Sequence, residues 1–235
     1  MSVTLLQTRT AARQRADMDG TSESDSFVSD TELNGYINAS LAEFNDIVVS
    51  KNLDNYLTSS QFTLTTTNTY ALSSSFYKLA GVDRLLNGSA SSLTAQWYDV
   101  HKFSFNERNF GNNAFVPVFY PPFCRYRIIG NNLTFLPAAS CAGTYQIWWY
   151  PKSPVLAADG DSYDDTQYWW EYVVVDVAIK MLSKEESDVS VLMAQKEQLK
   201  ERIHAMTADR DYGEPEQVGG RAMRTGNPTD GSWGF

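Results

Sequence analysis

Histidine and cysteine are scarce in this chain, and their scarcity excludes most catalytic arrangements that depend on them. Among 235 residues there are two histidines, His101 and His204, and two cysteines, Cys124 and Cys141. A nucleophilic serine or cysteine needs a histidine beside it, and we expect both histidines to be structural or on the surface. A zinc site would require all four side chains to converge, and their spacing matches no ligand pattern. The sequence predicts that the protein is not an enzyme and holds no metal or cofactor.

The two cysteines have no Cys-x-x-Cys spacing and lie 17 positions apart. Two strands of one hairpin could bring them together. The interpretation that we favour is a pair of reduced, buried thiols.

Long apolar runs and positive charge are also lacking. No segment approaches about 18 consecutive apolar residues, so we expect no membrane span, and the first 20 residues lack the apolar run of a signal peptide, which favours synthesis in the cytoplasm. Lysine and arginine number 19 against 28 aspartates and glutamates, a net charge of -9. This balance argues against a protein that neutralises nucleic-acid phosphates. It leaves open a protein that DNA merely passes.

Four aspartates gather at Asp159, Asp161, Asp164 and Asp165, a density that raises the question of a calcium site. The EF-hand template requires glycine at its sixth position and glutamate at its twelfth. Here Asp164 and Trp170 stand at those positions. We therefore expect a solvated loop whose acids favour the start of the next helix.

The chain does contain clear helix signals in its first 60 residues. Residues 4–19 contain good helix formers, with Arg13 and Arg15 near their end, and a second helix is expected to begin at Ser29. Ser29 and Glu32 have the spacing of a capping box, and Val28 and Leu33 that of a hydrophobic staple. Apolar residues then recur on one face as far as Val48.

Residues 61–151 change to strand-like patterns. Alternating, threonine-rich segments and a Gly-Asn-Asn turn between "RYRII" and "LTFLP" predict hairpins. Residues 152–208 return to helix: "YWWEYVVVDVAIKMLSKEES" is apolar nearly all round and predicts a buried helix, with a strand as the alternative because of its valines. The last helix places Leu192, Leu199, Ile203 and Met206 on a narrow stripe.

These patterns predict an α+β fold with four segments. Residues 1–60 and 152–208 form a helical bundle, and residues 61–151 form an inserted antiparallel β-sheet or barrel. Residues 209–235 are rich in glycine and proline without periodicity, so we expect an extended tail that is disordered alone.

Tryptophan and tyrosine cluster at residues 148–150 and 168–170. The favoured interpretation is core packing between the last strand and the buried helix, with one strand tryptophan turned outward. A sugar-stacking platform is the alternative, and a carboxylate pair for glycoside hydrolysis leaves no local motif by which sequence could exclude it. A carbohydrate-binding or hydrolytic β-domain protein therefore stays as an alternative of a different class.

An ordered series of segments carries a resemblance to a known family. These are "SDTELNGYINASLAEFNDIVVS", "YALSSSFYKLAGVD", "FSFNERN", "YRIIGNNLTFLP", "WWYPKSPVL" and "EYVVVDVAIKMLSKEESD". Together they resemble the head-to-tail adaptor (connector) proteins of tailed bacteriophages, over roughly Ser29 to Asp209. Many relatives have Leu-Pro where this chain has Leu72-Ser73, a departure that affects one turn.

The resemblance implies a virion protein of the neck, made in the host cytoplasm. It implies a ring, typically dodecameric, beneath the portal protein, which extends the DNA channel, docks the tail or nozzle, and lets packaged DNA pass without specific binding. A stopper or tail-completion protein of the neck is the near alternative. The tail would dock on the portal, with charges and bulky anchors at Arg221, Arg224, Trp233 and Phe235. Candidate subunit contacts are Glu107 with Arg108, and Asn34 with Asn38, which we expect to be exposed.

Overall fold

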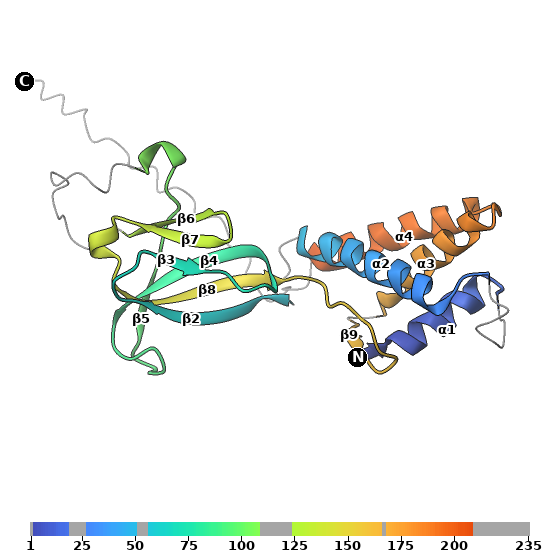
Figure 1. Ribbon diagram of the computed structural model, residues 1–235, viewed down its shortest axis with the longest axis horizontal. Helices are drawn as coiled ribbons and strands as arrows, with labels where there is room; N and C mark the ends of the chain where they lie inside the picture. The colour runs from blue at the N-terminus through green and yellow to red at the C-terminus, as the bar shows by residue number, and fades with distance from the viewer. Residues whose placement is uncertain (1, 19–26, 51–55, 109–123, 166–167, 209–235) are drawn as a thin grey trace, which may run out of the picture.

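Helices and sheets separate into two units along the long axis of the molecule (Figure 1). The computed structural model describes residues 2–18, 27–50, 56–108, 124–165 and 168–208. In the helical unit, α1 spans Leu5–Arg15, α2 Asp30–Ser50, α3 Trp170–Lys184 and α4 Ser190–Ala208. The second unit is built from strands. We call the two parts the helical unit and the β unit.

The β unit consists of two antiparallel sheets. One has the order β2-β8-β4-β5, with β2 at Thr58–Leu64, β8 at Gly143–Pro151, β4 at Phe76–Asn87 and β5 at Gln96–Asp99. The other has the order β3-β7-β6, with β3 at Thr69–Ala71, β7 at Asn132–Leu136 and β6 at Arg125–Ile129. Short 3-10 helices lie at Phe105–Glu107 (η2) and Ala138–Ser140 (η4). The expected sheet is confirmed, but among the described strands the sheets do not close into a barrel, because β2 and β5 remain edge strands.

The predicted turn between β6 and β7 is confirmed. Ile129 pairs with Asn132, so the loop consists of Gly130 and Asn131 alone. Gly130 has φ of 61°, in the left-handed region that two-residue hairpin turns require and that glycine adopts without strain.

Two separate apolar clusters stabilise the two units. The helical cluster gathers residues of α1 to α4, and α3 is buried nearly all round, as its sequence predicted. The β cluster lies between the two sheets and includes Phe135 and Tyr145, whose ring centroids are 4.6 Å apart. On α4, Leu192, Leu199 and Ile203 pack against the helical cluster, whereas Met206 is 48% exposed, so the predicted stripe ends one turn early.

A short two-stranded ribbon was not expected. β1 at Ser2–Thr4 pairs with β9 at Ser162–Asp164, inside the segment predicted as a loop. Val3 and Tyr163 lie opposite each other and are both buried in the helical cluster. Three-residue strands leave too little alternation in a sequence to be recognised.

The capping box of α2 is confirmed only in half. The backbone N–H of Glu32 donates to the Ser29 hydroxyl at 3.3 Å. The Glu32 carboxylate instead accepts hydrogen bonds from the Tyr36 hydroxyl at 2.7 Å and from the Lys184 ammonium at 2.6 Å. A full positive charge from α3 attracts this carboxylate more strongly than a backbone N–H does.

The expectation of reduced cysteines is wrong. Cys124 and Cys141 form a disulfide, with Cα atoms 5.7 Å apart. The hairpin of β6 and β7 reverses the chain, and η4 then returns it to the start of β6, so the two residues meet. Both are buried in the β cluster.

Among the described residues, none of the helices combines the length and the apolar character needed to cross a lipid bilayer.

Candidate assembly surfaces

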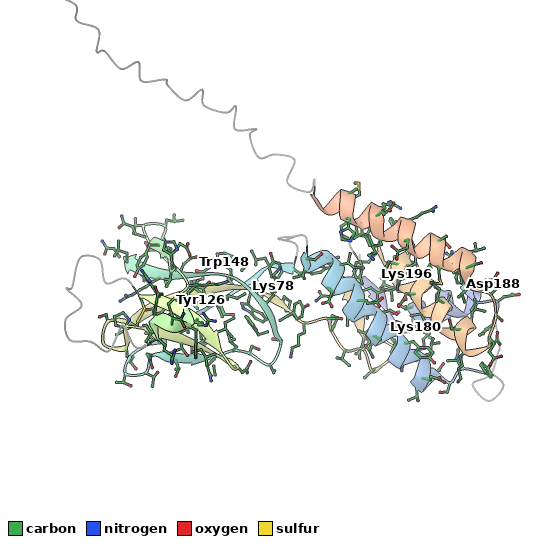
Figure 2. All side chains as sticks on the ribbon, turned by 90° about the horizontal axis from the view of Figure 1, so that it is seen from above. Lys78, Tyr126, Trp148, Lys180, Asp188 and Lys196 are labelled. Atoms are coloured by element: carbon green, nitrogen blue, oxygen red, sulfur yellow. A yellow bond between two sulfur atoms is a disulfide. The ribbon has the colours of Figure 1, made fainter. Side chains whose placement is uncertain are left out.

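A buried ionic network ties together three helices of the helical unit. The carboxylate of Asp176 on α3 is 4% exposed and accepts hydrogen bonds from Lys180 at 2.5 Å, from Lys196 of α4 at 2.7 Å and from the hydroxyl of Ser40 on α2. Lys196 also donates to Glu43 at 3.0 Å. Figure 2 labels Lys180 and Lys196 within the bundle. The network fixes the register of α2, α3 and α4, since each donor must reach one carboxylate.

Charge pairing stabilises the ionised state of this network. Burial alone would raise the pKa of Asp176, but the hydrogen bonds from Lys180, Lys196 and Ser40 outweigh it and hold that pKa below its ordinary value. Burial likewise opposes the charge on Lys196, and its hydrogen bonds to Asp176 and Glu43 raise its pKa nonetheless. Both shifts keep Asp176 and Lys196 charged, so that their ion pair holds α3 against α4.

A second set of ion pairs holds α1 in place. Arg9, whose side chain is 8% exposed, pairs with Asp30 at 2.7 Å and with Asp159 in the loop before β9. Arg15 pairs with Glu171 at the start of α3. Three of the four clustered aspartates therefore have structural roles. Asp159 is an ion-pair partner, and Asp161 accepts from the backbone N–H groups of Ala157 and Ala158, both at 2.8 Å. Asp165 accepts from the backbone N–H of Trp170 at 3.0 Å, as expected for an acid at a helix start.

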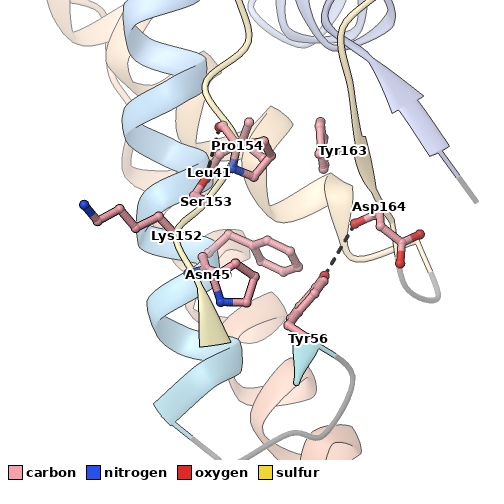
Figure 3. A pocket seen from close by; sticks show the side chains of 10 residues that line it. Leu41, Asn45, Tyr56, Lys152, Ser153, Pro154, Tyr163 and Asp164 are labelled. Atoms are coloured by element: carbon pink, nitrogen blue, oxygen red, sulfur yellow. Dashed lines mark hydrogen bonds between the residues drawn. The ribbon is translucent and has the colours of Figure 1, made fainter. Parts of the chain in front are cut away.

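The two units meet at a narrow junction. The Tyr77 hydroxyl on β4 donates to Asp46 of α2 at 2.6 Å, and the Tyr56 hydroxyl donates to the backbone carbonyl of Asp164 at 3.4 Å (Figure 3). Beside them lies a cavity of about 80 Å³, lined mainly by apolar and aromatic side chains and by the Pro151 to Pro154 segment. Among the described residues, Lys78 of β4 adds a hydrogen bond to the carbonyl of Val49 on α2 at 3.5 Å, and each of these contacts contributes to the angle between the units.

Asn34 and Asn38 lie on α2 and were expected to be exposed; that expectation is wrong. Both are half-buried against their own chain. The side chain of Asn38 donates to the carbonyl of Leu156 at 3.0 Å and accepts from its backbone N–H at 2.8 Å. It thereby fastens the segment between β8 and β9 onto α2. A subunit contact at these two residues stays a prediction.

Glu107 and Arg108 do not pair with each other. Glu107 accepts from Arg125 of β6 at 3.2 Å, while the guanidinium of Arg108 lies over the ring of Phe105, 4.5 Å from its centroid. Arg127 reaches the same ring at 5.5 Å. Phe105 thus stands, 48% exposed, between two guanidinium groups.

We call this group of side chains the basic face. It consists of Lys102, Phe105, Arg108, Arg125 and Arg127. Arg125 and Arg127 share one face of β6, because Tyr126 between them is buried on the other. Lys102 is exposed and bridges to Tyr126. Sequence reasoning found only Arg108 of these, since the cations come from two segments that are separated in the chain and adjacent in the fold.

The tryptophans mainly pack inside the molecule. Trp149 and Trp169 are 8% and 4% exposed, in the β cluster and the helical cluster respectively. Trp148 is half-buried and donates through its indole N–H to Asp83 at 2.6 Å. Trp149 and Trp169 are thus unavailable as stacking surfaces for a sugar, whereas Tyr168 of the same cluster is 67% exposed. The predicted tail residues Arg221, Arg224, Trp233 and Phe235 lie outside the described residues.

The described residues thus combine a helical unit held by buried ion pairs with a β unit that carries a charged face. The model of the SU10 adaptor protein family matches residues 3–224. The chain belongs to this family, which is a family of phage head-to-tail adaptors. No curated protein matches the chain.

Membership agrees with the resemblance read from the sequence. It implies a structural component of the phage virion that associates with portal and tail components.

Proposed function

We propose that this protein is the head-to-tail adaptor of its phage and forms a ring of about twelve copies beneath the portal. The ring continues the DNA channel from the capsid vertex and gives the tail or nozzle its docking surface. The observation that carries this proposal is the match of the adaptor family over residues 3–224, nearly the whole chain.

The charge of the chain supports a channel that DNA crosses freely. With a net charge of -9, a ring of identical subunits is strongly anionic. Like charges repel a duplex from the channel wall, which keeps packaged DNA mobile.

The tail, residues 209–235, is the proposed portal-docking segment. Its glycine and proline content gives it no core of its own, while Trp233 and Phe235 supply large apolar anchors and Arg221 and Arg224 supply charge. A segment of this composition binds by ordering on a partner, and its aromatic anchors offset the entropy lost.

A pull-down on the purified portal protein tests the docking proposal. The full chain should be retained, and a chain without residues 210–235 should be retained at least about tenfold more weakly, which corresponds to about 1.4 kcal/mol. Trp233→Ala with Phe235→Ala should reproduce most of this loss. The matched control is Thr225→Ala with Thr229→Ala, which changes the same segment without touching an anchor or a charge. Equal capture of the full and shortened chains would refute docking by the tail.

A further inference from the structure

Charge is distributed very unevenly between the two units. Residues 57–151 contain six of the 19 lysines and arginines but three of the 28 acids, so this segment carries a net charge of +3 and the rest of the chain -12. The acidic total of the protein therefore hides a cationic β unit. Four of its six cations belong to the basic face, together with a single acid, Glu107.

The basic face is pre-ordered for binding an anionic surface. Arg127 donates to the backbone carbonyl of Phe103 at 3.2 Å and Arg108 to that of Phe105 at 3.1 Å, so both guanidiniums are held in place beside the exposed ring. A guanidinium whose position is already fixed loses little rotamer entropy when it binds a carboxylate. An aromatic ring with arginines around it is also a composition enriched in protein interfaces.

A complementary surface lies at the far end of the same molecule. The turn between α3 and α4 carries Glu185, Glu186 and Asp188, all exposed, and we call these three residues the acidic turn. The one lysine beside them, Lys184, is already paired with Glu32 at 2.6 Å. The excess of negative charge at this turn is therefore not neutralised by that lysine.

The two surfaces cannot meet within one chain. Asp188 lies at the end of the helical unit that points away from the β unit, and Tyr126, which marks the basic face, lies in the β unit at the other end (Figure 2). Only a second molecule can bring them together. Two different surfaces of identical chains that bind each other form a heterologous contact, and such contacts close into rings when the rotation between neighbours allows it.

We propose that the basic face of one subunit docks on the acidic turn of the next copy of this chain in the ring. The inference rests on the proposed function and assigns its subunit interface. It gives Arg108 a partner in the neighbouring subunit and makes Glu107 the residue that orients Arg125. An electrostatic contact of this kind guides the copies into one orientation and weakens with salt.

Charge reversal on each side, alone and together, tests the contact. The readout is ring formation by the full chain on the purified portal ring, followed by mass photometry at low and physiological salt. Lys102→Glu with Arg108→Glu should weaken ring formation by at least about tenfold, and Glu185→Lys with Glu186→Lys should do the same. The four changes together should restore assembly to within about threefold of the unchanged chain, because the pairs are formed again with opposite sign. Lys152→Glu, a single charge reversal at an exposed lysine outside the basic face, is the matched control for Lys102→Glu alone and should assemble normally.

The possible failures can be told apart. If the rings form normally with either reversal, or if the combined variant gains nothing over the single reversals, the inference is overturned while the proposed function stands. If the reversals on the basic face abolish binding of a fluorescent DNA duplex and leave ring formation intact, the face contacts DNA and the inference is again overturned. A chain that stays monomeric in the presence of the portal protein contradicts both the inference and the proposed function.

Discussion

The side-chain amide of Asn38 makes two hydrogen bonds to the backbone of Leu156: it donates to the carbonyl at 3.0 Å and accepts from the N–H at 2.8 Å. An asparagine amide can reproduce the pairing of a neighbouring strand in this way, because it offers a donor and an acceptor side by side. The two bonds attach the segment that leaves the β unit to the helix α2. This side chain thus helps to fix the path between the units.

Replacement of Asn38 by alanine should lower the free energy of unfolding by about 1–3 kcal/mol, because both backbone groups of the buried Leu156 lose their partner. Urea denaturation at neutral pH measures this change. The control is Asn34→Ala on the previous turn of α2, whose side-chain carbonyl oxygen has no hydrogen-bond partner among the described residues. Equal stability losses in the two variants would contradict the role of the Leu156 contact.

Replacement of Asp176 by asparagine should cost about 2–3 kcal/mol, less than the about 3–5 kcal/mol typical of fully buried pairs, because Lys180 and Lys196 keep partial contact with water. Glu197→Gln is the control. Glu197 pairs with Lys200 at 3.6 Å in the exposed part of α4, and its loss should cost at most about 0.5 kcal/mol. Urea denaturation of both variants measures the two losses in free energy of unfolding. Equal losses would show that the buried network adds no stability.

The same carboxylate makes the stability of the helical unit depend on pH. The pKa of Asp176 is lowered in the folded state, since its hydrogen bonds from Lys180, Lys196 and Ser40 outweigh burial. Its contribution is therefore fully present above the unfolded-state pKa of about 3.9 and is lost as the pH falls through the lower folded-state value. Between pH 5 and pH 3, about the range in which unfolded aspartate titrates, the urea midpoint of the unchanged chain should fall more steeply than that of Asp176→Asn. Parallel curves would show that another group governs the acid range.

The disulfide between Cys124 and Cys141 should stabilise the β unit by about 3 kcal/mol, the value expected from chain entropy for a closed loop of roughly this length. Dithiothreitol should therefore lower the Tm of the oxidised chain and leave the Tm of the Cys124→Ser, Cys141→Ser variant unchanged. Thiol labelling of the urea-unfolded, non-reduced protein gives an independent reading. Two labelled thiols per chain would contradict the bond.

The Tyr77 to Asp46 hydrogen bond should restrain the angle between the units more than it stabilises either of them. Tyr77→Phe should lower the Tm by no more than about 4 °C, because an exposed hydrogen bond adds about 0.5–1 kcal/mol at most. Small-angle scattering should show a broader distribution of maximum dimensions. The comparison variant is Tyr98→Phe, which removes a hydroxyl that bonds Arg84 inside the β unit; the same broadening there would disprove a specific role for Tyr77.

The sequence was informative where a structure depends on neighbours in the chain. The valine-rich helix α3, the face of α2 and the turn at Gly130 all follow from local periodicity or from one glycine. It was uninformative where the partner is remote. The β1 to β9 ribbon joins residues about 160 positions apart. The disulfide depends on the path by which η4 returns the chain to the start of β6. The Glu32 carboxylate binds a lysine on another helix and does not complete the capping box.

The assembly surfaces show the same limit. The sequence pointed to Arg108 because it follows Glu107 in the chain. In the fold, Arg108 lies against Phe105, and Arg127 of β6 contacts the same ring, which no local pattern predicts. Counting charge over residues 57–151 would have signalled the cationic β unit from sequence alone. It would not have given the face on which those charges gather.

The central claim is that this chain assembles as a ring on the portal, and the most direct test is the mass of the complex that the two purified proteins form. Mass photometry of the portal ring with the full chain in excess should show one saturated species that has gained a fixed number of copies, about twelve. Images of that species should show the added copies as a closed ring on the axis of the portal. A portal ring whose mass is unchanged, or one that gains copies without a fixed end point, would contradict the account.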